Sequence, residues 1–184
     1  MTTLLFGLLL FFGIHLLPAM PRLRGALLNR LGPLCYRAGF SLLATAGLAL
    51  VVLAYVPQAG GGLIADDSAR QLARLLMPLA MILIVAAQLP GHLRRRLRHP
   101  MLLGVLLWAA SHLLANGSQL GALLLFGSFA GYALLAAWLQ QHRGWAAGKQ
   151  QARWQFDVLA VAAGIAAEVL LRSGHALLFG VGLV

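Results

Sequence analysis

Apolar residues run along the chain in long blocks that short polar segments separate. Six blocks approach or reach the ~20 mostly apolar residues that a membrane span needs. They cover about residues 3–20, 38–57, 71–89, 100–116, 119–140 and 156–182. Arg172, Ser173 and Gly174 interrupt the last block, so we expect a span followed by a frayed end. The pattern predicts an all-α protein, a polytopic integral membrane helix bundle with about six transmembrane helices.

Composition agrees with a surface that faces lipid. Of the 184 residues, 61% are hydrophobic and 10% are charged, whereas a soluble domain carries roughly 25% charged residues. We therefore expect one transmembrane domain over residues 1–184, with no separate soluble module. The single cysteine, Cys35, excludes an internal disulfide and a cysteine-rich metal site. No basic residue precedes the first apolar block, so we expect a retained helix and not a cleaved signal.

The charges are distributed by loop. Fourteen Lys and Arg oppose four Asp and Glu, and the positive residues gather in residues 22–37, 94–98 and 143–153, which form every second loop along the chain. The positive-inside rule then places these three segments in the cytoplasm and the N-terminus outside. Gly32-Pro33 and Pro90-Gly91 are turn signals in the loops that are expected on the inner side. A nucleic-acid role is excluded because no soluble basic face exists to present.

Few ionisable residues fall inside the apolar blocks, and such residues usually face the bundle interior and mark function. They are His15, His112 and Glu168, with Arg172 and His175 near the outer edge. Arg172 follows Glu168 by one helical turn, so we expect an intrahelical ion pair. A proton-handling role for Glu168 is the alternative. The sequence assigns no role to His175.

His15 and His112 have similar neighbours. On a helix, His15 shares its face with Phe11 and Phe12, and His112 shares its face with Trp108. A neutral imidazole has a lone pair for haem iron, and haem also needs apolar walls. The alternative is that each histidine makes an interhelical hydrogen bond.

Haem also needs cations beside its propionates, and arginines at the expected inner edge can supply them. Arg22, Arg24 and Arg98 are the candidates. Arg98 opens the triplet Arg98-His99-Pro100, in which Pro100 suits the first turn of a helix. His99 at the inner mouth of the span is the alternative ligand. The corner also has a purely structural interpretation, as does Asn116-Gly117, which predicts a helix C-cap.

Three stretches carry a family resemblance over nearly the whole chain. They are "FGIHLLPAMPRLR", "YRAGFSL" and "RHPMLLGVLLWAASHLLANGSQLGALLLFG". The chain resembles the NnrU family of bacterial membrane proteins, with RHP, Trp108, His112 and Asn116-Gly117 all in order. The resemblance implies a multi-pass protein of the bacterial inner membrane that is linked to nitrite and nitric oxide reduction in denitrification.

The chain is also similar to the 15-cis-zeta-carotene isomerase, a membrane haem b enzyme. That resemblance implies haem b with His15 and His112 as the axial iron ligands. The expected cofactor-binding residues are His15, His112, Arg22, Arg98, His99 and Trp108. The implied function is that of a haem b protein that serves nitrite and nitric oxide reduction or the redox-gated isomerisation of a polyene. Its expected partners are membrane lipid and either the reductase system or a lipid-soluble polyene.

Two other functions stay open. One is a cofactor-free membrane accessory protein for reductase assembly. The other is an S-adenosylmethionine-dependent membrane methyltransferase, because RHPxxxG (Arg98 to Gly104) also occurs in the isoprenylcysteine carboxyl methyltransferase type. Those enzymes carry a paired glutamate motif later in the chain, whereas the later acids here are the unpaired Asp157 and Glu168. Methyl transfer is therefore the less favoured alternative.

Overall fold

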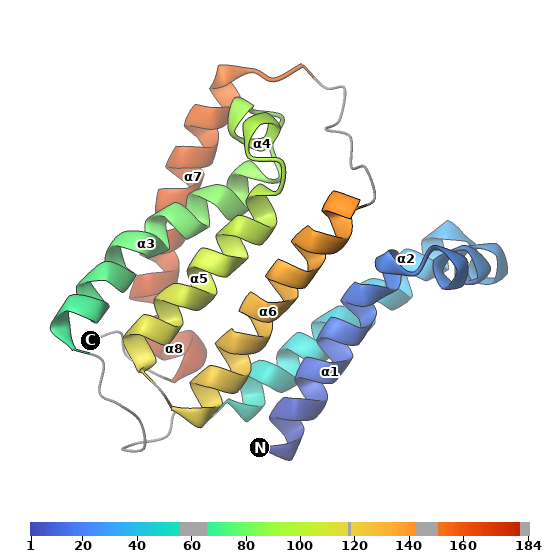
Figure 1. The fold of residues 1–184 in the computed structure, drawn as a ribbon, viewed down its shortest axis with the longest axis horizontal. Coiled ribbons are helices and arrows are strands. Elements are labelled where there is room, and N and C mark those ends of the chain that lie inside the picture. The colour runs from blue at the N-terminus through green and yellow to red at the C-terminus, as the bar shows by residue number, and fades with distance from the viewer. Residues whose placement is uncertain (56–65, 118, 143–150, 181–184) are drawn as a thin grey trace. The chain divides into compact units, whose positions relative to one another are not determined.

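The computed structural model describes residues 1–55, 66–117, 119–142 and 151–180 (Figure 1). Within these ranges the secondary structure is helical and no strand occurs, so the all-α prediction is confirmed. The chain divides into two compact units, Met1–Pro57 and Gln58–Val184. The prediction of one domain over the whole chain stays a prediction.

The first unit is a pair of helices joined by one turn. Helix α1 covers Thr2–Leu16, the 3-10 turn η1 covers Leu17–Ala19, and α2 covers Pro21–Ala54. The backbone of α2 breaks at Gly32, with φ 73° and ψ 165°. This positive φ favours glycine, and the helix resumes at Pro33, a residue suited to a helical first turn.

The prediction that residues 22–37 form a loop before the second span is wrong. Residues 22–37 are helical except at the Gly32 break, and the helix ends at Ala54 and not at residue 57. Leucine, arginine and alanine are good helix formers, so this polar stretch stays helical while its arginines lower its hydropathy. The predicted turn at Gly32-Pro33 is present only as a kink between two helical segments.

Two glycines let α1 and α2 approach closely. A Cβ added to Gly7 would lie 2.9 Å from the backbone nitrogen of Val51. A Cβ added to Gly47 would lie 2.8 Å from the backbone nitrogen of Phe11. Small residues at helix contacts are the usual means of packing in membranes. The contact fixes Phe11, and His15 one turn later, beside α2.

The second unit contains the remaining helices. They are α3 (Asp67–Ala86), α4 (His92–Arg96), α5 (Pro100–Asn116), α6 (Leu120–His142), α7 (Trp154–Ser173) and α8 (His175–Phe179). Helix α3 packs against both α5 and α7, and α6 packs against α5 (Figure 1). The short helices α4 and α8 both pack against α7.

Glycine also sets the two contacts of α3. A Cβ on Gly104 of α5 would lie 2.9 Å from the carbonyl oxygen of Ala80. A Cβ on Gly164 of α7 would lie 2.6 Å from the Cα of Ile82. Ala80 is fully buried between these neighbours. Helix α3 therefore packs closely against both α5 and α7, and a glycine of each neighbour permits the approach.

Most of the described long helices could cross a membrane. Five segments qualify by length and apolar composition: Thr2–Ala19, Pro21–Ala54, Asp67–Ala86, Leu120–Gln140 and Trp154–Ser173. Helix α5 is a sixth apolar helix with 17 residues, at the short end of the usable range of about 17–25. Large apolar side chains such as Leu53 and Leu75 are exposed. A helical membrane bundle is thus confirmed.

Most helix ends lie near their predicted positions. Helix α5 matches the predicted 100–116, and Gly117 caps it with φ 64° and an N–H bond to the Leu113 carbonyl. Helix α3 begins four residues before the predicted start, because the Asp66 carboxylate accepts the Ala69 N–H at 2.7 Å and caps it. The last block ends as α7 at Ser173, and α8 follows.

Candidate functional site

His15 lies in the last turn of α1 and is tethered to its own helix. Its Nδ1 donates to the Phe11 carbonyl oxygen at 2.7 Å. The Phe11 ring tilts over the imidazole with a centroid distance of 4.2 Å, and Phe40 of α2 meets it edge-on at 5.3 Å. The ring therefore lies between aromatic faces from both helices of its unit.

His112 lies near the end of α5 and is held in the same way. Its Nδ1 donates to the Trp108 carbonyl oxygen at 2.9 Å. Phe126 of α6 stacks on it with centroids 4.4 Å apart, and Trp108 tilts against it at 4.9 Å. Asn116 donates through Nδ2 to the carbonyl of His112 at 2.7 Å.

Further aromatic rings complete the surroundings of His112. Trp108 meets Phe126 and Phe129 edge-on at 5.2 and 5.3 Å. The His175 ring of α8 lies roughly parallel to His112, with centroids 6.4 Å apart. We call Trp108, His112, Phe126, Phe129 and His175 the aromatic cluster. The predicted neighbour Trp108 is confirmed, while Phe126 and His175 come from other helices.

The two histidines make the same hydrogen bond through Nδ1. A carbonyl oxygen can only accept, so each Nδ1 that is bonded to one carries the hydrogen. In a neutral ring the lone pair then belongs to Nε2. Metal-bound histidines in proteins commonly donate their other ring nitrogen to a backbone carbonyl in this way. Each ring thus has the donor chemistry that a haem iron requires.

The Arg98-His99-Pro100 corner has an unusual backbone. Arg98 has φ 53°, and within the described ranges no other residue except glycine has a positive φ. Such a conformation in a non-glycine residue is uncommon and strained. Pro100 begins α5 as predicted, and the Nε2 atom of His99 is buried. Arg98 itself is exposed.

The predicted site residues fall in both units. His15 and Arg22 belong to Met1–Pro57, while Arg98, His99, Trp108 and His112 belong to Gln58–Val184. Arg22 is exposed in the first turn of α2. Shared ligation of one haem by His15 and His112 stays a prediction. Within the described ranges no group of three or more His, Cys, Asp or Glu side chains is placed to bind a metal ion.

A comparison with protein families decides the affiliation of the chain. The family described as NnrU protein matches residues 3–183. The chain belongs to the NnrU family. No curated protein and no solved structure matches it. The predicted NnrU membership is therefore confirmed, while the relationship to the zeta-carotene isomerase stays a prediction.

Packing accounts for one part of the RHPxxxG motif in this NnrU protein. The last residue of the motif, Gly104, lies against α3, where a Cβ would lie 3.0 Å or less from Ile84 and Ala80. A helix contact therefore explains the glycine without a bound nucleoside. The motif is therefore weaker evidence for a methyltransferase.

The expected ion pair between Glu168 and Arg172 is wrong. Across the described ranges the acidic residues pair as Asp67 with Arg70 and Asp157 with His92, and Glu168 pairs with no base. Glu168 is half-buried and Arg172 is exposed. Helical spacing brings two such side chains near each other but does not hold them together against solvation and side-chain entropy.

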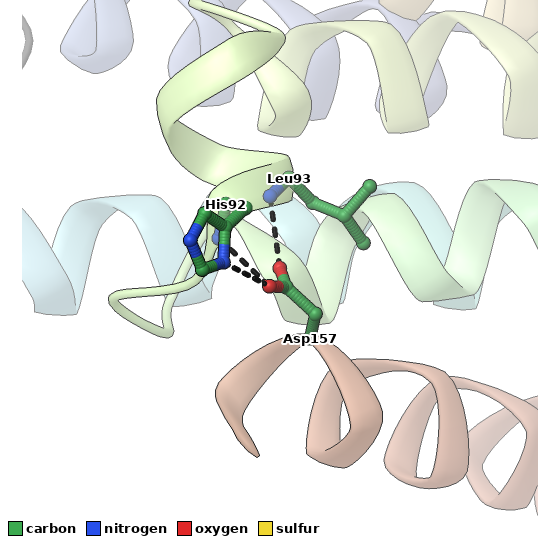
Figure 2. Close-up of polar contacts among 3 residues, drawn as sticks. All are labelled: His92, Leu93 and Asp157. Carbon is green, nitrogen blue, oxygen red and sulfur yellow. Dashed lines mark hydrogen bonds and ion pairs between the residues drawn. The ribbon is translucent and has the colours of Figure 1, made fainter. Parts of the chain in front are cut away.

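One polar network of this NnrU protein was not predicted. Asp157 of α7 accepts from the backbone N–H groups of His92 and Leu93 at 2.9 and 2.8 Å, and from Nδ1 of His92 at 2.8 Å (Figure 2). The residues are 64 and 65 positions apart. The feature of the sequence that could have indicated this network is that Asp157 is an isolated acidic residue beside the basic segment 143–153. The basic residues Arg143 and Lys149 of the predicted segment 143–153 lie outside the described residues.

Proposed function

We propose that this NnrU protein is a membrane haem b protein in which His15 and His112 would hold the haem iron. One observation carries the proposal: both rings donate Nδ1 to the carbonyl four residues earlier. Each neutral ring then presents Nε2 as the ligand atom. The pairing of the two histidines rests on the resemblance to the carotene isomerase and on the chemistry of each ring.

The surrounding side chains support the proposal in three ways. Phe11 and Phe40 beside His15, like Trp108 and Phe126 beside His112, provide flat apolar surfaces that suit a macrocycle. These surfaces exclude water and fix each ring plane. The exposed guanidinium groups of Arg22 and Arg98 provide cations for propionates. His99, whose Nε2 is buried, is the alternative ligand.

If bound, haem b would supply one-electron redox chemistry. The hydrogen bonds to the carbonyls of Phe11 and Trp108 hold the imidazoles of His15 and His112 on their own helices. We infer that the family's link to denitrification favours nitric oxide or nitrite reduction as the setting. The resemblance to the isomerase favours a polyene as the alternative substrate.

The first test is the absorption spectrum of the purified protein from haem-fed cells. We expect a low-spin haem spectrum that His15→Ala and His112→Ala each abolish, because an alanine has no ligand atom. His142→Ala, at the end of α6, is the matched control and keeps the spectrum. If either core variant keeps the wild-type spectrum, the pairing is wrong and His99 is the next ligand to substitute.

The same preparation separates the alternatives. A protein without a Soret band after haem feeding would favour the cofactor-free accessory role in reductase assembly. With haem bound, nitric oxide and a poly-cis polyene are added separately to the reduced protein. A spectral shift with nitric oxide alone supports the denitrification setting, and isomerised polyene supports the second substrate.

A further inference from the structure

Asp157 shapes a basic corner of the second unit. Its Oδ1 accepts the Leu93 N–H, and its Oδ2 accepts both the backbone N–H and Nδ1 of His92 (Figure 2). The carboxylate thus caps the first turn of α4 from a neighbouring helix. Gly91 permits the close approach, since a Cβ there would lie 2.4 Å from Oδ1.

The capped turn carries a dense positive charge. Arg94, Arg95 and Arg96 follow within α4, and Arg98 comes two residues later. All four side chains are exposed. In the described part of the chain, none of the four pairs with an acidic residue. We call residues 91–98 the arginine corner.

Other acids are too distant to neutralise the arginine corner. Glu168 lies eleven residues beyond Asp157 on α7, or about 16 Å at 1.5 Å per residue. Asp66 and Asp67 lie at the start of α3, whose other end leads to the corner, about 30 Å away by the same rise. The sequence has four acidic residues. The one nearest to the corner is Asp157, whose carboxylate already accepts hydrogen bonds from His92 and Leu93.

The backbone around the arginine corner is closely connected. The Arg153 N–H donates to the Pro90 carbonyl at 3.1 Å, which joins the start of α7 to the end of the α3 connection. The His99 N–H donates to the Leu97 carbonyl, and Arg98 takes its positive φ within this turn. The arginines therefore extend from a hydrogen-bonded platform at the ends of three spanning helices.

The location suits the headgroup region of a bilayer. Trp154, 66% exposed, begins α7 one turn before Asp157, and exposed tryptophans favour the membrane interface. An open groove begins at the Asp157 network and continues along α7. Its lining residues are His92, Leu93, Asp157, Val158, Val161 and Ala162. His92 and Leu93 of the arginine corner line this groove, so positive charge adjoins an apolar surface, which matches a molecule with an anionic head and a hydrocarbon tail.

We propose that the arginine corner and this groove form a binding site for an anionic phospholipid. The guanidinium groups bind the phosphate, for which their planar paired donors are well suited. The groove along Val158, Val161 and Ala162 receives an acyl chain. Topology requires only positive charge, whereas the three bonds to Asp157 give that charge a defined shape. This site is independent of haem.

The test compares lipid binding by two variants with the same charge loss. The full-length purified protein is delipidated and titrated with phosphatidylglycerol and with phosphatidylcholine, and bound lipid is counted by native mass spectrometry. We expect a triple substitution of Arg94, Arg95 and Arg96 to Gln to weaken phosphatidylglycerol binding by at least about tenfold. The control triple, with Arg24, Arg30 and Arg37 of α2 replaced by Gln, keeps wild-type affinity. Equal losses in both triples would overturn the site.

Asp157→Asn separates shape from charge. The change makes the chain more positive, so unstructured electrostatic attraction predicts equal or tighter binding of phosphatidylglycerol. A shaped site predicts binding about threefold weaker or worse, because the cap of α4 is lost. Equal or tighter binding by a folded Asp157→Asn protein would refute the proposal. If this variant does not fold, the paired triples decide the question alone. Displacement of the lipid by equimolar inorganic phosphate would also refute a lipid site.

Discussion

His15 and His112 make the same hydrogen bond to their own helix but contact different aromatic neighbours. Each donates Nδ1 to the carbonyl four residues earlier in its own helix. His15 meets one ring from α2, Phe40. His112 instead belongs to a cluster that draws rings from α6 and α8, with Phe126 stacked on it and His175 facing it.

The comparison separates local from tertiary contributions. A histidine on a helix can set its own tautomer through the preceding turn, with no help from another helix. What lies on the faces of the ring depends on which helices approach and how closely. Within its own unit the His15 region joins α1 and α2, while the His112 region joins α5, α6 and α8. The second region should therefore be the more sensitive to distant substitutions.

The largest expected effect comes from glycines that permit helix contact. Gly47→Val forces a side chain against the Phe11 backbone in the His15 region, and Gly104→Val forces one against the Ala80 carbonyl beneath the His112 helix. Backbone atoms cannot yield as side chains do, so we expect each variant to lose about 3 kcal/mol of unfolding free energy. Thermal or denaturant unfolding in detergent measures the loss.

The control for these variants is a glycine in open space. A Cβ on Gly13 or Gly127 would meet nothing within 4 Å. Gly13→Ala and Gly127→Ala should change the unfolding free energy by less than about 1 kcal/mol. A loss in the controls as large as in Gly47→Val would show that packing at the helix contacts is not the cause.

An effect of similar size at His112, but a smaller one at His15, is expected from the stacked rings. Phe126 is 5% exposed and covers a face of His112, so Phe126→Ala leaves a cavity and should lower the unfolding free energy by about 3 kcal/mol. Phe40 is only half-buried beside His15, and Phe40→Ala should lower it by about 1 kcal/mol. Equal losses in parallel unfolding curves would contradict the difference drawn between the two regions.

The smallest expected effect concerns Asn116. Its amide donates to the His112 carbonyl at 2.7 Å, and one such bond contributes about 1 kcal/mol. Asn116→Leu should lower the unfolding free energy by that amount and leave the His15 region unchanged. Hydrogen exchange of the last turn of α5, compared with that of α1, gives the measurement. Faster exchange in α1 would contradict the local assignment.

Local signals in the sequence predicted part of this structure well. Pro100 and Asn116-Gly117 marked both ends of α5 because their backbone preferences act within one turn. Trp108 was placed beside His112 by helical spacing alone. The first part of α2 was missed because its arginines resemble a loop in a hydropathy profile, although arginine and leucine favour helix equally well.

The long-range contacts could not be predicted from the sequence. Nothing local joins Asp157 to His92 and Leu93, which lie more than sixty residues earlier. The approach of His175 to His112 likewise follows from the Ser173 end of α7 and the turn into α8. Helical spacing did predict a pair between Glu168 and Arg172, but the structure does not form it. Proximity along one helix face permits an ion pair and does not supply its free energy.

The carbonyl tether has a consequence for biogenesis. A histidine that is bonded to its own preceding turn acquires its ligand geometry when its helix forms, which in a membrane precedes helix association. Each imidazole is therefore ready before its helix meets a neighbour. If the proposed haem is bound, its capture can follow insertion as a late maturation step, because the tether of each histidine forms within a single helix.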